Sequence, residues 1–424
     1  MTAVTATASS QRVLRSPAEI RRSRIIGIIY LLMAAFVLVV FAMGTEGDAT
    51  FRLAADGDRF EVPDLVFSAA GLSYIAAGFF AFLGGIQLTR GFGKSTNIIL
   101  GLAMAVIAFA FLGWAAAGKS LSLVGMLQLT VVKSVPITFG ALSGVMCERV
   151  AVINIGIEGM LLSGAFLGAL IGSVAGPWMG IIAGVLVGGL LAFALAVLAI
   201  KYRVDQIIAG VVINIFALGI TSYLTSSILV DNSDTLNRVE IFRAWKVPLL
   251  GDIPVIGPIF FNHNFFVYGM YVLVAVIAFA LFKTRWGLRS RAVGEHPKAA
   301  DTLGINVFRF RYLNVILGGM IAGFGGAYFT VGSAGSFDEN MSAGRGFIGL
   351  AAMIFGRWHP VGAFGAALVF GFADSLQAKL AILQTPIPGE FLLMAPYIVT
   401  VIVVAGVVGR ARPPAADGQP YIKD

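Results

Sequence analysis

Long apolar runs recur along almost the whole chain, and no other feature of the sequence restricts the possible folds so strongly. An α-helix needs about 20 apolar residues to cross the hydrocarbon core of a bilayer. Two runs also fit a broken or re-entrant element, because Leu121–Met146 contains Lys133 and Pro136 and because Gly346–Phe355 is short. The runs predict helices near Ile25–Met43, Leu65–Leu88, Asn97–Ala117, Leu121–Met146, Val152–Gly172, Trp178–Ile200, Gln206–Leu229, Phe265–Phe282, Leu313–Val331, Gly346–Phe355, Val361–Ala378 and Phe391–Val408.

The composition excludes an ordinary globular domain. Hydrophobic residues make up 58% of the 424 residues, and charged residues make up only 12%. No single core could hide so much apolar surface from water. We therefore predict an all-α, polytopic integral membrane protein of the plasma (inner) membrane, with about 11–12 transmembrane helices.

The basic residues lie mostly in short loops between the apolar runs, so the net charge of +8 reflects membrane topology and not nucleic-acid binding. If the basic tail of residues 1–24 is cytoplasmic, the acidic loop from Glu46 to Glu61 lies outside and the long segment Asp231–Asn264 lies outside as well. The basic cluster in residues 283–311 then lies inside, and Lys119 is a minor exception to a rule that holds almost everywhere. This alternation predicts that both termini are cytoplasmic.

The residue types that bind metals or act as catalytic groups form no recognisable pattern. Cys147 is the single cysteine, and His263, His296 and His359 are scattered along the chain without the spacing of metal ligands. A nucleophile–base arrangement is not recognisable either. The sequence therefore predicts no metal site, no catalytic residues and no enzymatic activity.

The stretch AVGEHPKAADTLGI, residues 292–305, predicts a short helix in a cytoplasmic loop. Pro297 suits the first helical position, and Gly304 suits the residue just past the end. The helix would be roughly 10 Å long, which is too short to cross a bilayer. Its apolar side could pack into a groove on another protein, although a solvated amphipathic loop has the same pattern. That apolar side would consist of Ala299, Ala300 and Leu303.

The same stretch resembles the coupling segment in the membrane subunits of ABC importers for simple sugars, nucleosides and branched-chain amino acids, although His296 stands where that family usually has asparagine. SVPITFGALSGVMCERVAVINIGIEGMLLSGAF, residues 134–166, resembles the start of the permease core. DQIIAGVVINIFALGITSYL and GRGFIGLAAMIFGRWHPVGAFGAALVFG are similar to later segments of nucleoside and simple-sugar permeases, in the same order. The coupling residues implied by this resemblance are Gly294, Glu295, His296, Pro297, Ala299, Ala300 and Gly304.

The resemblance implies that several subunits act together. In that family two membrane subunits form the pathway, each docks on a cytoplasmic ABC ATPase, and an extracytoplasmic binding lipoprotein delivers the solute. This chain would bind no cofactor, because the partner uses the ATP, and it would pair with a homologous or identical permease. The predicted parts are the basic tail 1–24, the extra helices and acidic loop 25–120, the permease core 121–410 and the cytoplasmic tail 411–424. Residues 1–120 depart from the shorter family members.

The segment GWAAAGKS, residues 113–120, matches the phosphate-loop pattern by chance. A phosphate loop needs a strand before it and a helix after it. In this chain the first glycine ends an apolar helix, and the charge alternation puts Lys119 outside, away from cytoplasmic ATP. The sequence therefore predicts that a separate subunit hydrolyses ATP.

Polar residues inside the predicted spans are few. Asn154 and Glu158 are four residues apart and would stack on one helix face, with Glu158 about 9 Å from a helix start at Val152. A charge facing lipid would cost on the order of 3 kcal/mol, so Glu158 must face protein or a polar cavity. Each such residue either bridges helices or contacts the solute, and bridging is favoured for Glu158 and Asn214. The candidates for the pathway are Asn154, Glu158, Asn214 and Asp374.

The sequence as a whole predicts the transmembrane permease subunit of an ATP-driven ABC importer, which forms the translocation pathway for a small polar solute. Nucleosides are the favoured substrates, and a simple-sugar or branched-chain amino-acid permease is the alternative within the family. The alternative from another class is a proton-coupled secondary transporter in which Glu158 or Asp374 relays protons.

Overall fold

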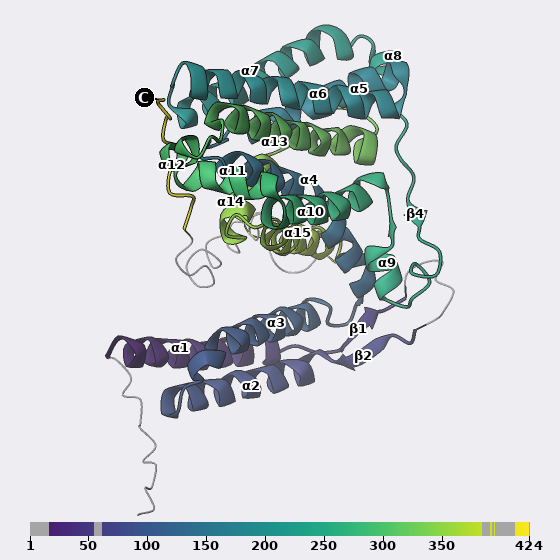
Figure 1. The fold of residues 1–424 in the computed structure, drawn as a ribbon. Coiled ribbons are helices and arrows are strands. Elements are labelled where there is room, and N and C mark those ends of the chain that lie inside the picture. The colour runs from purple at the N-terminus through teal and green to yellow at the C-terminus, as the bar shows by residue number, and fades with distance from the viewer. Residues whose placement is uncertain (1–16, 55–61, 384–390, 392–393, 395–411, 424) are drawn as a thin grey trace, which may run out of the picture. The chain divides into compact units, whose positions relative to one another are not determined.

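The computed structural model describes residues 17–54, 62–383, 391, 394 and 412–423. The chain divides into two compact units, one within residues 1–52 and 63–121 and the other within residues 53–62 and 122–424. Within the described residues, ten helices are long and apolar enough to cross a membrane. This confirms the predicted all-α, polytopic membrane fold (Figure 1). The predicted helix Phe391–Val408 lies outside the described residues, apart from two isolated positions.

Unit 1 contains three long helices and a small sheet. The helical elements are α1 (Pro17–Phe36), its π-helical continuation η1 (Val37–Ala42), α2 (Ala69–Thr89), η2 (Gly93–Ser95) and α3 (Thr96–Ala115). The strands are β1 (Asp48–Arg52), β2 (Leu65–Ser68) and β3 (Ser120–Ser122), in the order β2-β1-β3, with β1 and β2 antiparallel.

Two details of unit 1 explain its local structure. The helix predicted from Leu65 starts only at Ala69, because residues Leu65–Ser68 pair with β1 and the Ser68 side chain caps α2 by accepting a hydrogen bond from Gly71 N. Helices α1 and α2 approach closely at Gly84, where an added Cβ would lie 3.2 Å from the carbonyl oxygen of Gly27. Small residues thus permit close helix packing, as is usual within membranes.

Unit 2 holds the remaining spans, which are connected by loops with short elements of their own. The long helices are α4 (Leu123–Glu148), α5 (Ile157–Ala175), α6 (Pro177–Ala196) with η3 (Val197–Lys201), α7 (Gln206–Leu224) with η4 (Thr225–Leu229), α10 (Phe265–Lys283), α13 (Val307–Phe329) with η5 (Thr330–Ala334) and α15 (Pro360–Ile382). The shorter elements are α8 (Ser233–Leu236), β4 (Trp245–Lys246), α9 (Ile256–Phe260), β5 (Asn262–His263), α11 (Arg285–Glu295), α12 (Pro297–Thr302) and α14 (Arg345–Phe355).

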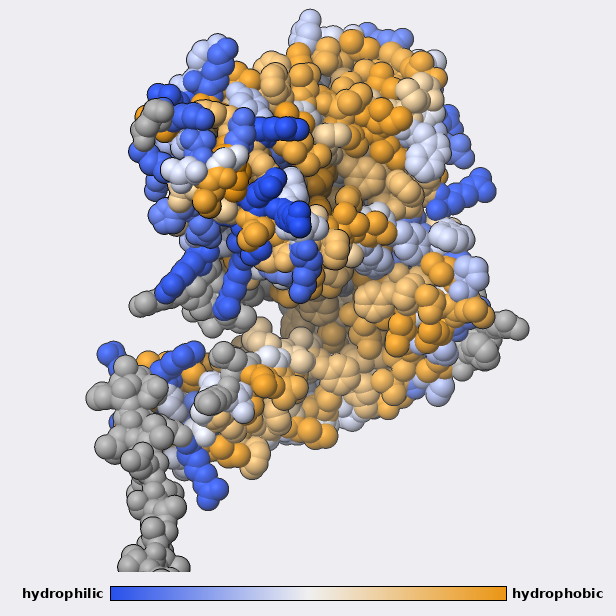
Figure 2. All heavy atoms as spheres, in the orientation of Figure 1, coloured by the Kyte–Doolittle hydropathy of each residue, from blue (hydrophilic) through white to orange (hydrophobic). Residues whose placement is uncertain are grey.

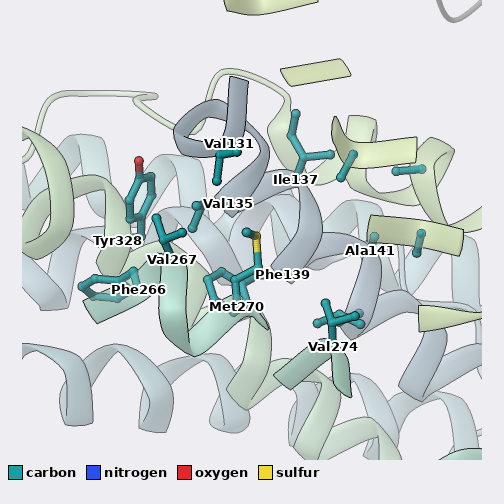
Figure 3. Close-up of a cluster of buried hydrophobic side chains, with 14 of the residues drawn as sticks. Val131, Val135, Ile137, Phe139, Ala141, Phe266, Val267, Met270, Val274 and Tyr328 are labelled. Carbon is teal, nitrogen blue, oxygen red and sulfur yellow. The ribbon is translucent and has the colours of Figure 1, made fainter. Parts of the chain in front are cut away.

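Helix α4 lies in the core of unit 2 and is continuous, although the sequence left open a break at Pro136. Proline has no N–H, so the carbonyl oxygen of Val132, four residues earlier, loses its helical partner. The hydroxyl of Tyr328 on α13 donates a hydrogen bond to that oxygen at 3.1 Å. Figure 3 shows Tyr328 beside Val131 and Val135 of α4. A side chain from another helix therefore compensates for the proline.

Helix α13 packs between α4 and the α5–α6 pair by means of glycines (Figure 1). A Cβ added at Gly188 of α6 would lie 2.2 Å from the carbonyl oxygen of Gly319, and one added at Gly164 of α5 would lie 2.5 Å from that of Gly323. No side chain fits at these points, so the backbones themselves are in contact. Figure 2 shows hydrophilic side chains gathered at the end of unit 2 that carries α11, α12 and the C-terminal residues.

Candidate functional site

The predicted short helix is present as α12. Pro297 occupies its first turn, and Gly304 follows its end with a left-handed φ of +80°, as the sequence predicted. Helix α11 precedes it and was not predicted, because four of its eleven residues are charged and its apolar residues are few. Thr284 starts α11 by accepting a hydrogen bond from Gly287 N at 3.2 Å. The two helices form one compact connection between α10 and α13.

The apolar side chains of α12 do not share one exposed face as predicted. Ala300 is only 2% exposed and packs into the core of unit 2, whereas Leu303 is 82% exposed and Ala299 is also exposed. The reason is that Ala300 packs against other residues of unit 2, so the opposite side of α12 is left exposed. Leu303 and Ala299 are therefore the exposed apolar side chains here, and Ala300 fixes the helix in place.

The residues just before α12 are held by the body of unit 2. A Cβ added at Gly294 would lie 2.4 Å from the carbonyl oxygen of Arg149, so only glycine fits against the end of α4. The Glu295 carboxylate accepts a hydrogen bond from Ala415 N at 3.1 Å. His296 is exposed and occupies the N-cap position of α12 without a side-chain capping bond. Asparagine, which the family usually has there, is a strong N-cap residue.

Glu148 and Arg149, at the end of α4, hold the turn between α14 and α15. In that turn Arg357 and Trp358 both have left-handed φ values, 55° and 53°, which cost roughly 1–2 kcal/mol per residue. Arg149 donates hydrogen bonds to both of their carbonyl oxygens, at 2.7 to 3.3 Å. The Trp358 indole N–H donates to the Glu148 carboxylate. This pair of residues therefore compensates for a strained turn.

Arg149 lies in a crowded basic environment. Its guanidinium and that of Arg291 both pack on the ring of Phe282, at 5.3 and 5.0 Å from the ring centre. Burial lowers the pKa of Arg149, and the positive charge of Arg291 lowers it further. The end of α4, the end of α11 and the α14–α15 turn are thus joined at a single junction beside α12.

The start of α5 differs from the prediction, and this changes the positions of Asn154 and Glu158. The helix begins at Ile157, not near Val152, so Glu158 lies in its first turn and the two residues do not stack on one helix face. Side chains of α7 bind the backbone that precedes the helix. Gln206 Oε1 accepts a hydrogen bond from Ile153 N at 2.7 Å, and Asn214 Nδ2 donates one to the Ile155 carbonyl at 2.9 Å. These bonds hold the segment in a non-helical conformation.

The Glu158 carboxylate binds the start of α14. It accepts hydrogen bonds from the Ser342 hydroxyl at 2.6 Å, from Gly344 N at 2.8 Å and from Gly346 N at 2.6 Å. The first N–H groups of a helix have no partners within the helix, and a negative charge there is favoured by the helix dipole. All three bonds are donated to the carboxylate, so Glu158 joins the first turn of α5 to the start of α14.

Asn154 and Asn214 also lie between elements of unit 2. Asn214 Oδ1 accepts a hydrogen bond from Gly159 N at 2.8 Å, so this side chain joins α7 to the first turn of α5. Asn154 is fully buried, and its amide lies 3.5 Å from the sulfur of Cys147 and 3.6 Å from that of Met160. Asn214 therefore bridges α7 and α5, whereas the buried side-chain oxygen of Asn154 has no hydrogen-bond partner among the described residues.

Asp374 has different surroundings, because it belongs to a group of charges inside the membrane. Its carboxylate pairs with Arg345 at 3.5 Å, with the side chains 12% and 24% exposed, and Lys133 also acts on it electrostatically. At 1.5 Å per residue, Asp374 lies about 21 Å from the start of α15, and Lys133 lies about 22 Å from the end of α4. Those two helix ends meet at Trp358, so both charges are at a similar depth. We call Lys133, Arg345 and Asp374 the charged triad.

The four predicted pathway residues are therefore not brought together. Asn154, Glu158 and Asn214 surround the start of α5, and Asp374 lies on α15, while α14 touches both groups through Gly346 and Arg345. Sequence reasoning missed Arg345 and treated Lys133 only as an interruption of a span. A signal was present, since Lys133 and Asp374 are rare charges in apolar runs, and such charges are usually paired.

The GWAAAGKS segment crosses the end of α3 and the start of β3. A helix therefore precedes it and a strand follows, which is the reverse of the order that a phosphate loop requires.

Together, the fold and the site define a class: a polytopic helical membrane protein with a charged group deep among its spans and a short helix displayed on a polar loop. The comparisons with known proteins specify it further. The family model "Branched-chain amino acid transport system / permease component" matches residues 126–405. The chain belongs to this family of permease components.

The similar proteins include several ABC transporter permeases. The guanosine ABC transporter permease protein NupQ of Bacillus subtilis is 44% identical over 69% of this chain and 95% of its own length. The nucleoside ABC transporter permease protein NupC of Lactococcus lactis subsp. cremoris is 41% identical over 72% of this chain and 99% of its length. A second guanosine permease of Bacillus subtilis, NupP, is 26% identical over 57% of this chain and 70% of its length. The family match starts at Met126, so unit 1 lies outside it.

Proposed function

We propose that this permease carries nucleosides and forms its pathway as part of an ATP-driven importer. The observation that carries the proposal is the 44% identity to a guanosine permease across 95% of that protein. A nucleoside permease at 41% identity over 99% of its length supports the same substrate class. The simple-sugar alternative has weaker support, since a putative glucose permease of Haloferax volcanii is 31% identical over 77% of its length.

The exposed side of α12 is the proposed docking point for a cytoplasmic ABC ATPase. Leu303 projects from a polar loop in which α11 carries Arg285, Arg289 and Arg291. By the positive-inside rule this basic loop is cytoplasmic, and so are both termini. An exposed leucine surrounded by charges suits a small apolar groove on a soluble partner.

The proposed second membrane subunit is a homologous permease and not a second copy of this chain. Two proteins of Bacillus subtilis, NupQ and NupP, are both named as guanosine ABC transporter permeases. This chain is 44% identical to NupQ and 26% identical to NupP. An equivalent pair would combine this chain with a more distant relative. A substrate-binding lipoprotein outside the membrane would complete the importer.

The charged triad is proposed to line the pathway. Three charges facing lipid at mid-membrane depth would each cost about 2.5–3.5 kcal/mol, so they face protein or a water-filled space. Arg345 and Asp374 keep part of their side chains exposed, whereas the Glu158 carboxylate and the Asn214 amide are engaged in hydrogen bonds within unit 2. A carboxylate can accept a hydrogen bond from a ribose hydroxyl while the neighbouring guanidinium donates one to that hydroxyl's oxygen, and charged groups make the stronger hydrogen bonds.

The energy source distinguishes this importer from a proton-coupled transporter. We expect right-side-out vesicles that contain the whole transporter to take up labelled guanosine when ATP is supplied inside. Uptake should stop without ATP and should persist when a protonophore collapses the proton gradient. Loss of uptake on adding the protonophore, with internal ATP held constant, would instead favour the secondary transporter.

Replacing Glu158 should affect stability and not selectivity. Glu158→Ala leaves three donors at the start of α14 unpaired, and each unpaired buried donor costs about 1–3 kcal/mol. Glu158→Gln keeps one acceptor oxygen and should lose less. Thermal unfolding in detergent measures the loss, with Ser342→Ala as the control that removes a single donor. A changed preference among nucleosides, at unchanged stability, would place Glu158 in the pathway instead.

A further inference from the structure

The C-terminal residues Arg412–Lys423, which we call the C-terminal strap, lie against the connection that carries α12 (Figure 1). Ala416 N donates a hydrogen bond to the Gly294 carbonyl oxygen at 3.0 Å, and Ala415 N donates one to the Glu295 carboxylate at 3.1 Å. Lys423 pairs with Asp301 at 3.4 Å. The strap therefore binds the residues before α12 and a residue within it.

The strap is also fixed to the start of α13. Arg311 is buried and donates a hydrogen bond to the Gln419 carbonyl oxygen at 3.1 Å. The ring of Tyr421 packs on that of Phe308, with their centres 5.3 Å apart, and Tyr421 is only 6% exposed. A loosely attached tail would not bury an aromatic side chain or supply the partner of a buried arginine.

A tight turn in the strap reaches the end of α4. Gly418 has a left-handed φ of +73°, and Asp417 interacts directly with the Glu148 carboxyl group, the same group that binds Trp358. Burial raises the pKa of Asp417 to about 6. The buried position of this side chain agrees with a strap that is packed into unit 2 and not merely resting on it.

We infer that the C-terminal strap is a positioning element for energy coupling: it fixes α12 to the ends of α4 and α13, so that movement of a docked ATPase reaches the membrane spans. Helix α12 has only six residues, and isolated helices of that length are not stable in water. It needs support from its surroundings, and the strap bonds both Glu295 and Asp301. The inference rests on the proposed docking of an ATPase at α12.

The test compares neighbouring strap residues that differ in burial. Tyr421→Ser removes a side chain that is 6% exposed, and Ile422→Ser changes one that is 50% exposed and serves as the matched control. A third variant ends at Ala411 and lacks the strap. All are assayed in the assembled transporter for nucleoside uptake, for ATP hydrolysis and for thermal unfolding. Coupling energies commonly correspond to factors of 5 to 150, so we expect uptake per ATP hydrolysed to fall about tenfold in Tyr421→Ser and in the truncated chain.

A second readout does not depend on transport. A spin label is attached to Leu303→Cys in a Cys147→Ser background, and its mobility reports how firmly α12 is held. We expect the mobility to increase when Tyr421 is replaced or the strap is removed, and to stay constant in Ile422→Ser. Unchanged mobility in the truncated chain would overturn the positioning role whatever the protein transports. Increased mobility together with wild-type uptake per ATP would overturn the link to coupling. Increased mobility in a transporter that never takes up nucleosides would instead refute the proposed function.

Discussion

Replacing Leu303 with arginine should abolish ATP-driven uptake and release the ATPase, while unit 2 stays folded. Leu303 is 82% exposed, so its replacement removes no packing within the chain. In a complex, the arginine would place a charge in an apolar groove, and disruption of a central interface residue costs about 2 kcal/mol or more, roughly a thirtyfold loss of affinity. Co-purification of the ATPase with the permease and thermal unfolding in detergent measure the two effects separately.

Leu249→Arg is the matched control for this prediction. Leu249 is 84% exposed but lies in the long segment between α7 and α10, which is proposed to be on the other side of the membrane. This variant should retain the ATPase. Ala300→Arg should behave differently from both, because Ala300 is buried and the substitution should lower the unfolding temperature. If Leu303→Arg retains both the ATPase and wild-type uptake, α12 is not the docking point.

Replacing Asp374 with asparagine should weaken transport and remove discrimination for the ribose hydroxyls. The carboxylate is proposed to accept a hydrogen bond from a hydroxyl of the solute, and hydrogen bonds to charged groups contribute about 1.5–3 kcal/mol, or roughly 10- to 150-fold. The wild-type protein should therefore take up guanosine better than its 2′- and 3′-deoxy analogues. In Asp374→Asn we expect guanosine uptake to fall toward the level at which the wild-type protein takes up one of these deoxy analogues.

Two further variants separate recognition from folding at this position. Asp374→Glu keeps the charge that balances Arg345 and Lys133, so it should keep the membrane fold and part of the discrimination. Arg345→Gln removes the partner of Asp374 and should also weaken uptake. The pathway role of the charged triad would be wrong if Asp374→Asn discriminated against the deoxy analogues as strongly as the wild-type protein does.

The spans and the short helix could be predicted because each depends on local features of the sequence. Apolar runs of sufficient length specify spans, and Pro297 and Gly304 specify the limits of α12. The continuity of α4 could not be predicted in this way. Whether Pro136 breaks the helix depends on the Tyr328 hydroxyl, which lies almost 200 residues further along the chain.

The surroundings of the polar groups were predicted less well, because they depend on contacts between distant segments. Gln206 and Asn214 of α7 bind the backbone before α5, and the helix begins later in the sequence than predicted. Asn154 therefore lies outside the helix and does not stack on Glu158. Ala300 and Leu303 have the same apolar character in the sequence, and only the packing of α12 shows that one is buried and the other exposed. The strap was predicted as a plain tail, since its residues have no apolar periodicity.

The most direct test of the account is the substrate profile of the assembled transporter. Uptake of labelled guanosine is measured in cells that contain this permease with its partner subunits, against an excess of unlabelled competitors. A strain that lacks the permease gives the background. We expect saturable uptake that other nucleosides inhibit and that glucose, ribose and leucine leave unchanged. Inhibition by a free sugar or by leucine, with no effect of unlabelled nucleosides, would contradict it.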